Sequence, residues 1–261
     1  MDKNIKICLV ASDSDKASEA LSTLQEKYKE NLVAEVEEAD AIITLGGDGF
    51  LLHYLRSHTD LSKPIFPLNL GTVGYLLNDY ETELSLLDRI RKSESINVSP
   101  LALTIVKEDG TEEEGIAFNE ISLIRQTPQA LDLRISINGE VKMDGYRGDG
   151  IMVATPMGST AYNLVAGGTA LRLDSEKIAL TTILSANPRG WIGTHISNQD
   201  SVLIENRNPQ KRKARAELDS VAIEDAKSVE VKQSEKKYTL LYDKGRSLDV
   251  KIDRAIFPSL I

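Results

Sequence analysis

Apolar residues along the first third of the chain follow two different spacings. Short, nearly continuous apolar runs indicate strands buried on both faces, at 5–11, 41–45 and 64–68. Apolar residues that recur every three or four positions indicate helices between and after these strands, at 17–28, 50–55 and 81–92. Strands that alternate with helices in this way predict a parallel sheet covered by helices, a Rossmann-like α/β domain.

The pattern changes near 93–100, and after this point strand signals follow one another with almost no helix between them. Strands are predicted at 101–107, 116–125, 131–138, 151–155, 178–185, 201–205, 222–224, 229–232 and 239–242. Asn138-Gly139 is a two-residue hairpin signal between two of them, and only 159–166 has helical spacing. The second half is therefore expected to be all-β, a β-sandwich.

These changes in pattern divide the chain into three segments. Residues 1–95 are expected to form the α/β domain, and residues 96–240 are expected to form the β-rich domain. The last segment, 241–261, ends in an apolar tail that can pack against the first domain. We therefore expect the chain to return to its N-terminal domain at its end.

Composition narrows the range of partners. Forty acidic against thirty-one basic residues give a formal charge of −9, the opposite of the balance typical of nucleic-acid-binding proteins. Aromatic residues make up only 5%, too few for a platform that stacks bases of single-stranded nucleic acid. No apolar segment is long enough to span a membrane, and the single cysteine, Cys8, lies in an apolar run. We expect a cytoplasmic protein that binds neither nucleic acid nor membrane, and the acidic total does not exclude a nucleotide ligand.

The string Gly46-Gly47-Asp48-Gly49 stands where a predicted strand ends and a helix begins, the position at which open α/β sheets bind ligands. Glycines let the backbone approach phosphate oxygens, and the start of a helix supplies free N–H donors. A carboxylate repels phosphate, so Asp48 is expected to have a separate role. It can hold Mg²⁺ or accept a proton from an attacking hydroxyl. The alternative is a tight turn in which Asp48 caps the helix.

A second glycine-rich turn follows the next predicted strand, with Asn69, Gly71 and Gly74-Tyr75. Parallel strands end at the same edge of a sheet, so the two turns are expected to form two walls of one cleft. Tyr75 can stack on a base or pack against the protein, and the sequence leaves both interpretations open.

Two further groups of polar residues lie in the β-rich half. Asn119-Glu120 interrupts the apolar strand 116–124, where neighbouring side chains face opposite sides; a carboxylate suits a vicinal diol and an amide suits an adenine edge. The alternative is exposed alternation on an edge strand. The run 145–163 reads as a glycine-rich loop, a strand, a glycine turn and a short helix; its polar positions are Arg147, Asp149, Ser159, Thr160 and Asn163. Arg147 and Asp149 point the same way if their segment is extended, and Ser159 and Thr160 can cap the helix or donate to phosphate.

In order and spacing, these motifs resemble those of the NAD kinase family over nearly the whole chain. They are Gly46-Gly47-Asp48-Gly49, Asn69…Gly71…Gly74-Tyr75-Leu76, Asn119-Glu120, and Gly148-Asp149-Gly150…Thr155-Pro156…Gly158-Ser159-Thr160-Ala161-Tyr162-Asn163. The first motif is shared with diacylglycerol and sphingosine kinases, whereas the string from Gly158 to Tyr162 is far more selective. The resemblance implies phosphorylation of the 2′-hydroxyl of the adenosine ribose of NAD by ATP or another donor.

The resemblance also implies roles for individual residues. Asp48 would accept the proton of the 2′-hydroxyl, and Gly49 would leave room for the dinucleotide. Asn119 would face adenine, and Glu120 the nicotinamide-side ribose. Asp149 would contact the nicotinamide end, across a subunit boundary if the chain forms the dimers or tetramers of the family. The remaining NAD-binding positions it implies are Tyr75, Arg147, Thr160, Ala161, Tyr162, Asn163 and Val165. The implied phosphate and ATP positions are Gly46, Gly47, Gly49, Asn69 and Gly71.

The resemblance further implies Mg²⁺ or another divalent metal that accompanies the phosphoryl donor, and a homodimer or homotetramer. The sequence departs from the family at four places: Phe50 replaces a threonine, Val165 a serine and Thr169 a proline, and 184–191 lacks a proline-histidine pair. A lipid kinase of the diacylglycerol or sphingosine type is the alternative enzyme. A catalytically silent NAD-binding protein is the alternative outside enzymes, and the presence of Asp48 counts against it.

Overall fold

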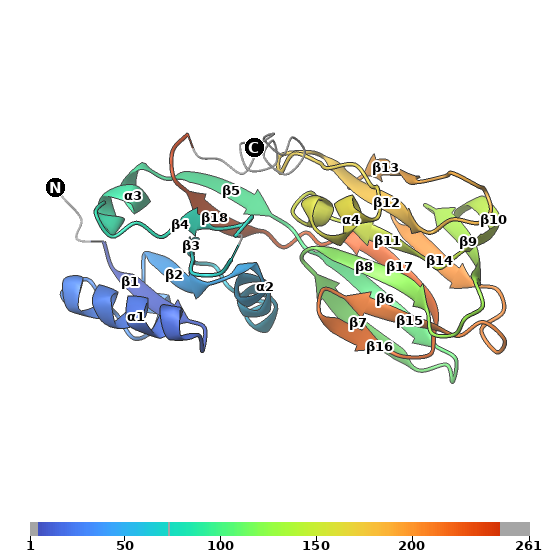
Figure 1. The fold of residues 1–261 in the computed structure, drawn as a ribbon, viewed down its shortest axis with the longest axis horizontal. Coiled ribbons are helices and arrows are strands. Elements are labelled where there is room, and N and C mark those ends of the chain that lie inside the picture. Colours follow the sequence, from blue (N-terminus) through green and yellow to red (C-terminus); the bar gives the residue numbers. More distant parts are fainter. Residues whose placement is uncertain (1–4, 73, 246–261) are drawn as a thin grey trace. The chain divides into compact units, whose positions relative to one another are not determined.

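A computed structural model describes residues 5–72 and 74–245 of the chain (Figure 1). By its internal contacts the chain divides into two compact units, Met1–Val98 with Lys237–Ile261, and Ser99–Lys236. Residues 246–261 lie outside the described part, and with them most of the expected C-terminal segment 241–261. The proposed domain limits at 95 and 240 stay predictions. Within the described residues, no helix is both long and apolar enough to cross a membrane.

The first unit is an α/β layer whose first three strands are parallel. Its sheet has the order β1-β2-β3-β18-β5, with β4 paired to β3. The strands are β1 Ile7–Ala11, β2 Ala41–Gly46, β3 Ile65–Asn69, β4 Asn78–Asp79, β5 Glu94–Val98 and β18 Tyr238–Tyr242. The helices are α1 Asp15–Lys27, α2 Asp48–Ser57 and α3 Leu86–Lys92, with a 3₁₀ turn, η1, at Val36–Glu38. The Rossmann-like α/β prediction is confirmed in this unit.

Local chemistry explains where these helices begin. The Ser14 side chain accepts a hydrogen bond from the backbone N–H of Ala17 at 3.3 Å and caps α1. α3 begins at Leu86, not at residue 81 as predicted, because Ser85 caps it by accepting from the N–H of Asp88 at 3.4 Å. The core that α1 and α3 share with the sheet is apolar: Ile7, Ala17, Leu24, Tyr28, Ile43, Leu45, Phe66, Leu68 and Leu86.

The strand register brings the two glycine turns together. β2 and β3 pair in parallel from Ile42 with Ile65 to Gly46 with Asn69, so both strands end at the same level. β18 lies beside β3 in parallel and beside β5 antiparallel. The strand expected at 239–242 is β18, and its first residues, expected in the β-rich domain up to 240, join the sheet of the first unit instead. Periodicity gives no information about which sheet a strand joins.

The second unit consists of two six-stranded sheets, in the orders β10-β9-β14-β17-β6-β7 and β13-β12-β11-β8-β15-β16. The strands of the first sheet are β6 Leu101–Lys107, β7 Glu112–Ala117, β9 Leu131–Ile137, β10 Glu140–Gly148, β14 Val202–Asn206 and β17 Ala226–Gln233. Those of the second are β8 Glu120–Arg125, β11 Gly150–Ala154, β12 Lys177–Ile183, β13 Gly193–Ser197, β15 Ala214–Leu218 and β16 Val221–Ile223. One apolar core joins side chains of both sheets, which confirms the β-sandwich.

Three local predictions in this unit differ from the structure. The strand predicted at 116–125 is two strands, β7 and β8, separated at Phe118-Asn119. The glycine-rich run at 145–150 is not a loop, since it lies in β10 and at the start of β11. Its glycines permit close packing: a Cβ at Gly150 would lie 2.6 Å from the carbonyl oxygen of Leu123 on the neighbouring strand. The predicted helical segment 159–166 is a 3₁₀ turn, η2 (Gly158–Thr160), followed by a one-turn helix, α4 (Tyr162–Val165).

Candidate active site

The two glycine-rich turns of the first unit touch one another. The backbone N–H of Leu70 donates to the carbonyl of Gly46 at 2.8 Å. A Cβ at Gly71 would lie 3.1 Å from the Cα of Gly47, so the two backbones pass closer than side chains would allow. Phe50 packs against the same turn, because a Cβ at Gly46 would lie 2.7 Å from its ring. The predicted adjacency of the two turns is therefore present.

The Asp48 carboxylate links the two turns. Its Oδ2 accepts a hydrogen bond from the backbone N–H of Tyr75 at 2.9 Å, and its Oδ1 accepts one from the N–H of Leu76 at 2.8 Å. Asp48 is the first residue of α2, and Gly47, which has no side chain to offer, occupies the capping position. The interpretation that Asp48 caps its own helix is thus wrong, because its oxygens reach the second turn instead. Two donors fix the plane of this carboxylate.

The residue after Asp48 is open to its surroundings. A Cβ at Gly49 would meet no atom within 4 Å other than those of its chain neighbours and of its own helix backbone. Asn69 supports the second turn, since its Oδ1 accepts from the N–H of Gly71 at 2.9 Å. Gly74 has a backbone φ of +71°, and a Cβ there would lie 2.3 Å from the Asn69 amide. The Tyr75 side chain is 41% exposed and available for contact.

A tyrosine that the sequence pattern missed lies beneath the second turn. The hydroxyl of Tyr242, on β18, donates to the carbonyl oxygen of Leu76 at 3.1 Å. The side chain is fully buried. Burial, and secondarily the negative charge of Asp48, raise the pKa of Tyr242 well above its usual range, so the hydroxyl stays protonated as a donor. Tyr242 thus supports the peptide whose N–H groups hold Asp48.

The second unit presents a peptide that carries Asn119 and Glu120. The Asp219 carboxylate, which the sequence pattern also missed, accepts from the backbone N–H groups of Phe118 at 3.0 Å, Asn119 at 2.9 Å and Glu120 at 3.2 Å. The N–H of Thr155 donates to the carbonyl of Asn119 at 2.9 Å. Asp219 therefore satisfies the backbone N–H groups of this peptide, and Thr155 satisfies the carbonyl of Asn119.

The two side chains on this peptide have unused polar atoms. Asn119 Oδ1 and Glu120 Oε2 are buried and have no hydrogen-bond partner within the part of the chain that the structure describes. Burial, with a smaller contribution from the charge of Asp219, raises the pKa of Glu120 to about 8. Buried polar atoms are rarely left unsatisfied, so this pair has the character of a ligand-binding site.

The string from Gly158 to Asn163 lies against this peptide. A Cβ at Gly158 would lie 2.2 Å from the carbonyl oxygen of Asn119, so only glycine fits. Two of the polar side chains of the string hold the turn itself. Ser159 Oγ donates to the carbonyl of Pro156 at 2.7 Å and accepts from the N–H of Leu171 at 2.8 Å.

Asn163 is engaged in the same way. Its amide donates to the carbonyls of Ser159 at 2.8 Å and Thr169 at 3.1 Å, and accepts from the hydroxyl of Thr181 at 2.6 Å. Its predicted contact with NAD stays a prediction, and a side-chain contact would have to replace one of these bonds. Four neighbours are at least partly exposed: Thr160, Ala161, Tyr162 and Val165.

Comparison with known proteins identifies the family to which both units belong. The model of the ATP-NAD kinase N-terminal domain matches residues 4–90, and that of the ATP-NAD kinase C-terminal domain matches residues 118–241. The NAD kinase of Xylella fastidiosa is 38% identical over 95% of this chain and 94% of its own length. The NAD kinase of Hyphomonas neptunium is 39% identical over 97% of this chain and 98% of its own length.

The chain belongs to the ATP-NAD kinase family. It is therefore an enzyme, a kinase that phosphorylates NAD. Two solved structures share its fold. Yeast NADH kinase, complexed with NADH, has a TM-score of 0.84 at 19% identity and covers 100% of this chain and 90% of its own. An NAD kinase from Archaeoglobus fulgidus, in complex with ATP, has a TM-score of 0.77 at 23% identity and covers 95% of this chain and 99% of its own.

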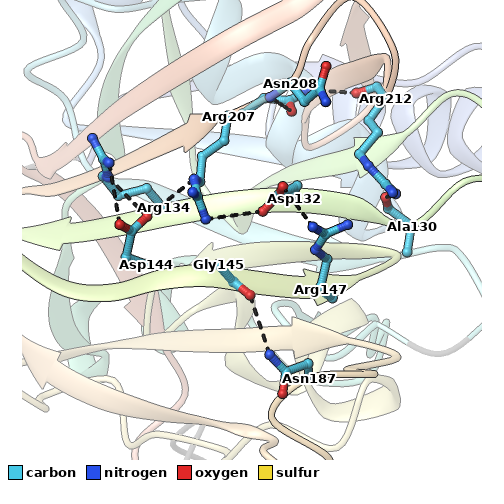
Figure 2. A network of polar contacts seen from close by, with 11 residues as sticks. Ala130, Asp132, Arg134, Asp144, Gly145, Arg147, Asn187, Arg207, Asn208 and Arg212 are labelled. Carbon is cyan, nitrogen blue, oxygen red and sulfur yellow. Dashed lines mark hydrogen bonds and ion pairs between the residues drawn. The ribbon is translucent and has the colours of Figure 1, made fainter.

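Two residues implied by the ATP-NAD kinase resemblance, Arg147 and Asp149, have separate partners. Arg147 Nη2 lies 3.0 Å from Asp132 Oδ2, and Asp149 Oδ1 lies 2.7 Å from Arg125 Nε. Figure 2 shows Arg147 beside Asp132, which Arg207 approaches from the other side at 3.5 Å. The structure pairs Arg147 with β9 and Asp149 with β8, so it does not bring the two together. Their proposed contacts with NAD stay predictions.

Proposed function

We propose that this member of the ATP-NAD kinase family transfers the γ-phosphoryl group of ATP to the 2′-hydroxyl of the adenosine ribose of NAD, with Asp48 as general base. The observation that carries the proposal is the Asp48 carboxylate, held in one plane by the N–H groups of Tyr75 and Leu76 beside the open space at Gly49. A carboxylate fixed at the edge of a glycine turn is placed to receive a proton from a bound sugar.

The chemistry needs few protein groups. In phosphoryl transfer the ribose oxygen forms a bond to the γ-phosphorus while the bond from that phosphorus to the ADP oxygen breaks. The hydroxyl proton passes to the carboxylate of Asp48 as the new bond forms. Alignment and charge neutralisation dominate the rate of such reactions. The two backbone donors on Asp48 serve alignment because they limit rotation of the carboxylate.

We assign NAD recognition to the second unit. The unpartnered Oε2 of Glu120 suits the vicinal hydroxyls of the nicotinamide-side ribose, and the unpartnered amide oxygen of Asn119 suits the amino group of adenine. Tyr75 of the first unit is also assigned to NAD, because its exposed ring can stack on the adenine. Contacts are also assigned to Arg147, Asp149, Thr160, Ala161, Tyr162, Asn163 and Val165. The Val165 side chain is 83% exposed, so a bound NAD can reach it.

We assign the phosphates to the glycine turns of the first unit, at Gly46, Gly47, Gly49, Asn69 and Gly71. The described residues contain no group of three or more His, Cys, Asp or Glu side chains able to hold a metal ion. The Mg²⁺ or other divalent metal we expect therefore fits as part of the donor, since Mg²⁺ binds mainly through phosphate oxygens and water with one or two carboxylates. There it would neutralise phosphate charge.

Two further proposals concern the state of the enzyme in the cell. We infer a cytoplasmic homodimer or homotetramer, in which Asp149 of one subunit reaches the nicotinamide end of NAD bound to another. This follows from the family resemblance. A sedimentation measurement of the purified protein, with and without NAD, would give the oligomeric state directly.

The decisive experiment measures NADP formation from NAD and ATP in a coupled assay. Asp48→Asn should retain its fold and most of its NAD binding, while turnover falls at least about a hundredfold, because general-base assistance is worth roughly 10²–10⁴-fold. Asp15→Asn is the matched control, since Asp15 is also the first residue of a helix in the same unit. Near wild-type turnover in Asp48→Asn would refute the assigned role.

The same assay separates the alternatives. Polyphosphate in place of ATP, and NADH in place of NAD, define the donor and the acceptor. The two alternatives raised by the sequence, a lipid kinase and a catalytically silent NAD-binding protein, do not agree with the match to the ATP-NAD kinase family.

A further inference from the structure

Asp219 lies at the turn between β15 and β16, in the left-handed backbone region with φ of +51°. Its carboxylate accepts from three successive backbone N–H groups, those of Phe118, Asn119 and Glu120. Its own N–H donates to the carbonyl of Glu120 at 3.1 Å. Asp219, about 100 residues away in sequence, thus accepts from every backbone N–H of the segment 118–120. This segment carries the unpartnered side-chain oxygens of Asn119 and Glu120.

This peptide needs such support because the chain leaves the sheet there. β7 ends at Ala117 and β8 begins at Glu120, so Phe118 and Asn119 lie outside both strands. Backbone donors that leave a ladder require other partners. Thr155 satisfies the opposite side of the peptide: its hydroxyl donates to the carbonyl of Phe118 at 2.6 Å, and its N–H donates to that of Asn119 at 2.9 Å.

We propose that Asp219 is a positioning residue for NAD, which holds the peptide between β7 and β8 so that the side chains of Asn119 and Glu120 reach the dinucleotide together. This inference rests on the proposed function. Asp219 has its carboxylate turned to the backbone, so it acts through its neighbours and is not expected to touch NAD itself.

The charge of Asp219 gives the role a second signature. Burial, and then the negative charge of Asp219, raise the pKa of Glu120. Tyr162 is a further titratable group nearby, and its pKa is raised by burial first and then by the charges of Glu217, Glu120 and Asp149. A ribose hydroxyl donates to the ionised form of Glu120, so NAD affinity should rise with pH through the pKa of Glu120. Removal of the charge at position 219 should move that midpoint to lower pH.

Asp219→Asn is the most informative variant. Asparagine tolerates a positive φ, so the hairpin turn can keep its shape. Its amide nitrogen cannot accept a hydrogen bond, however, and the negative charge is gone. Asp225→Asn is the matched control, because Asp225 has φ of +57° in the next turn and its Oδ1 pairs with Lys213 Nζ at 2.9 Å, not with the 118–120 peptide.

Two measurements on purified protein test the inference. Calorimetry at pH 9, where Glu120 is ionised, should show a Kd for NAD raised roughly tenfold or more in Asp219→Asn and unchanged in Asp225→Asn, because buried donors lose a charged acceptor. Carbon NMR of the Glu120 carboxyl in ligand-free protein should show its midpoint at lower pH in Asp219→Asn alone. If the asparagine variant does not fold, Asp219→Gly, unstrained at this φ, takes its place in both measurements.

An unchanged Kd for NAD would overturn the inference. A raised Kd with an unmoved Glu120 midpoint would also overturn it, because general loosening of the fold would explain that result. Failure of the proposed function gives a different result, since wild type and Asp225→Asn would then form no NADP from NAD and ATP. If wild type binds NAD and Asp219→Asn binds it equally well, only the inference fails.

Discussion

At the scale of single residues, the surroundings of a side chain decide the role that we propose for it. Asp48 and Asp219 both receive backbone N–H groups, but their surroundings differ. Asp48 lies beside the open space at Gly49, whereas the carboxylate of Asp219 binds the peptide beneath Glu120. The same side-chain chemistry therefore serves, in our proposal, as a proton acceptor in one place and as a support in the other.

A substitution at Gly49 separates effects on folding from effects on NAD binding. In Gly49→Ala the new methyl group meets no atom within 4 Å beyond its chain neighbours and its own helix backbone, and alanine is preferred over glycine in a helix by up to about 1 kcal/mol. We expect the midpoint of urea unfolding to stay the same or to rise slightly. The KM for NAD should rise, because the methyl group occupies space assigned to the dinucleotide. An unchanged KM would show that NAD does not pass beside Gly49.

The raised pKa of Glu120 predicts that the free energy of unfolding depends on pH. Its pKa rises from an ordinary value of 4.5 to about 8 on folding, so the folded state binds more protons than the unfolded state between these values. Its contribution to stability is fully present below pH 4.5 and is lost as the pH rises through about 8. Glu120→Gln cannot ionise, so its free energy of unfolding should exceed that of wild type by a growing amount, on the order of a few kcal/mol at pH 9. Unfolding curves in urea at pH 5, 7 and 9 measure this difference, and a constant difference would contradict the prediction.

At the scale of elements, the position of Asp48 depends on a strand from the far end of the chain. β18 lies beside β3, and its Tyr242 donates to the carbonyl of Leu76, whose N–H holds the Asp48 carboxylate. Asn78 ties the same region together, because its amide donates to the carbonyls of Pro67 on one side and Leu241 on the other. The turn that orients the proposed base is thus anchored on two strands.

Tyr242→Phe tests this anchor. The substitution leaves the Leu76 carbonyl without its donor, which should lower stability by about 1 kcal/mol and turnover by roughly threefold to tenfold as the turn gains freedom. Tyr238→Phe is the matched control on the same strand, because the Tyr238 hydroxyl donates to the carbonyl of Thr59 at 2.9 Å, away from Asp48. Stability from urea unfolding should fall in both variants, and turnover only in Tyr242→Phe. Equal turnover in the two variants would remove Tyr242 from the catalytic arrangement.

The sequence pattern predicted the elements whose apolar runs are nearly continuous. The first three strands of the first unit, the sandwich and the adjacency of the two glycine turns follow from apolar spacing and from the rule that parallel strands end together. Strands with few apolar residues, such as β5, β10 and β13, were missed. The run at 145–150 was mistaken for a loop because glycine serves close strand packing as readily as it serves turns. Asp219 and Tyr242 carry no local signal, since their importance comes from contacts about 100 and 166 residues away in sequence.

At the scale of the whole molecule, the protein and its proposed substrates carry net charge of the same sign. The chain carries a formal charge of −9, and both NAD and ATP are anionic. The proposed phosphate-binding turns offer backbone donors from glycine-rich peptides in place of a dense basic patch. Neither turn contains a lysine or arginine, so neutralisation of the phosphate charge must come from elsewhere, and a metal that travels with the donor would supply it.

Removal of divalent metal should therefore separate catalysis from folding. In our proposal the metal is bound mainly through the phosphate oxygens of the donor, so a chelator is expected to leave the melting temperature and NAD binding of the enzyme unchanged. NADP formation should stop, because phosphoryl transfer needs the charge of the γ-phosphate to be neutralised. The measurement pairs thermal unfolding with the coupled assay, before and after addition of EDTA and after return of excess Mg²⁺. Our assignment requires that Mg²⁺ restores activity while the melting temperature stays constant throughout. A melting temperature that falls with EDTA and recovers with Mg²⁺ would instead indicate a metal bound by the protein itself.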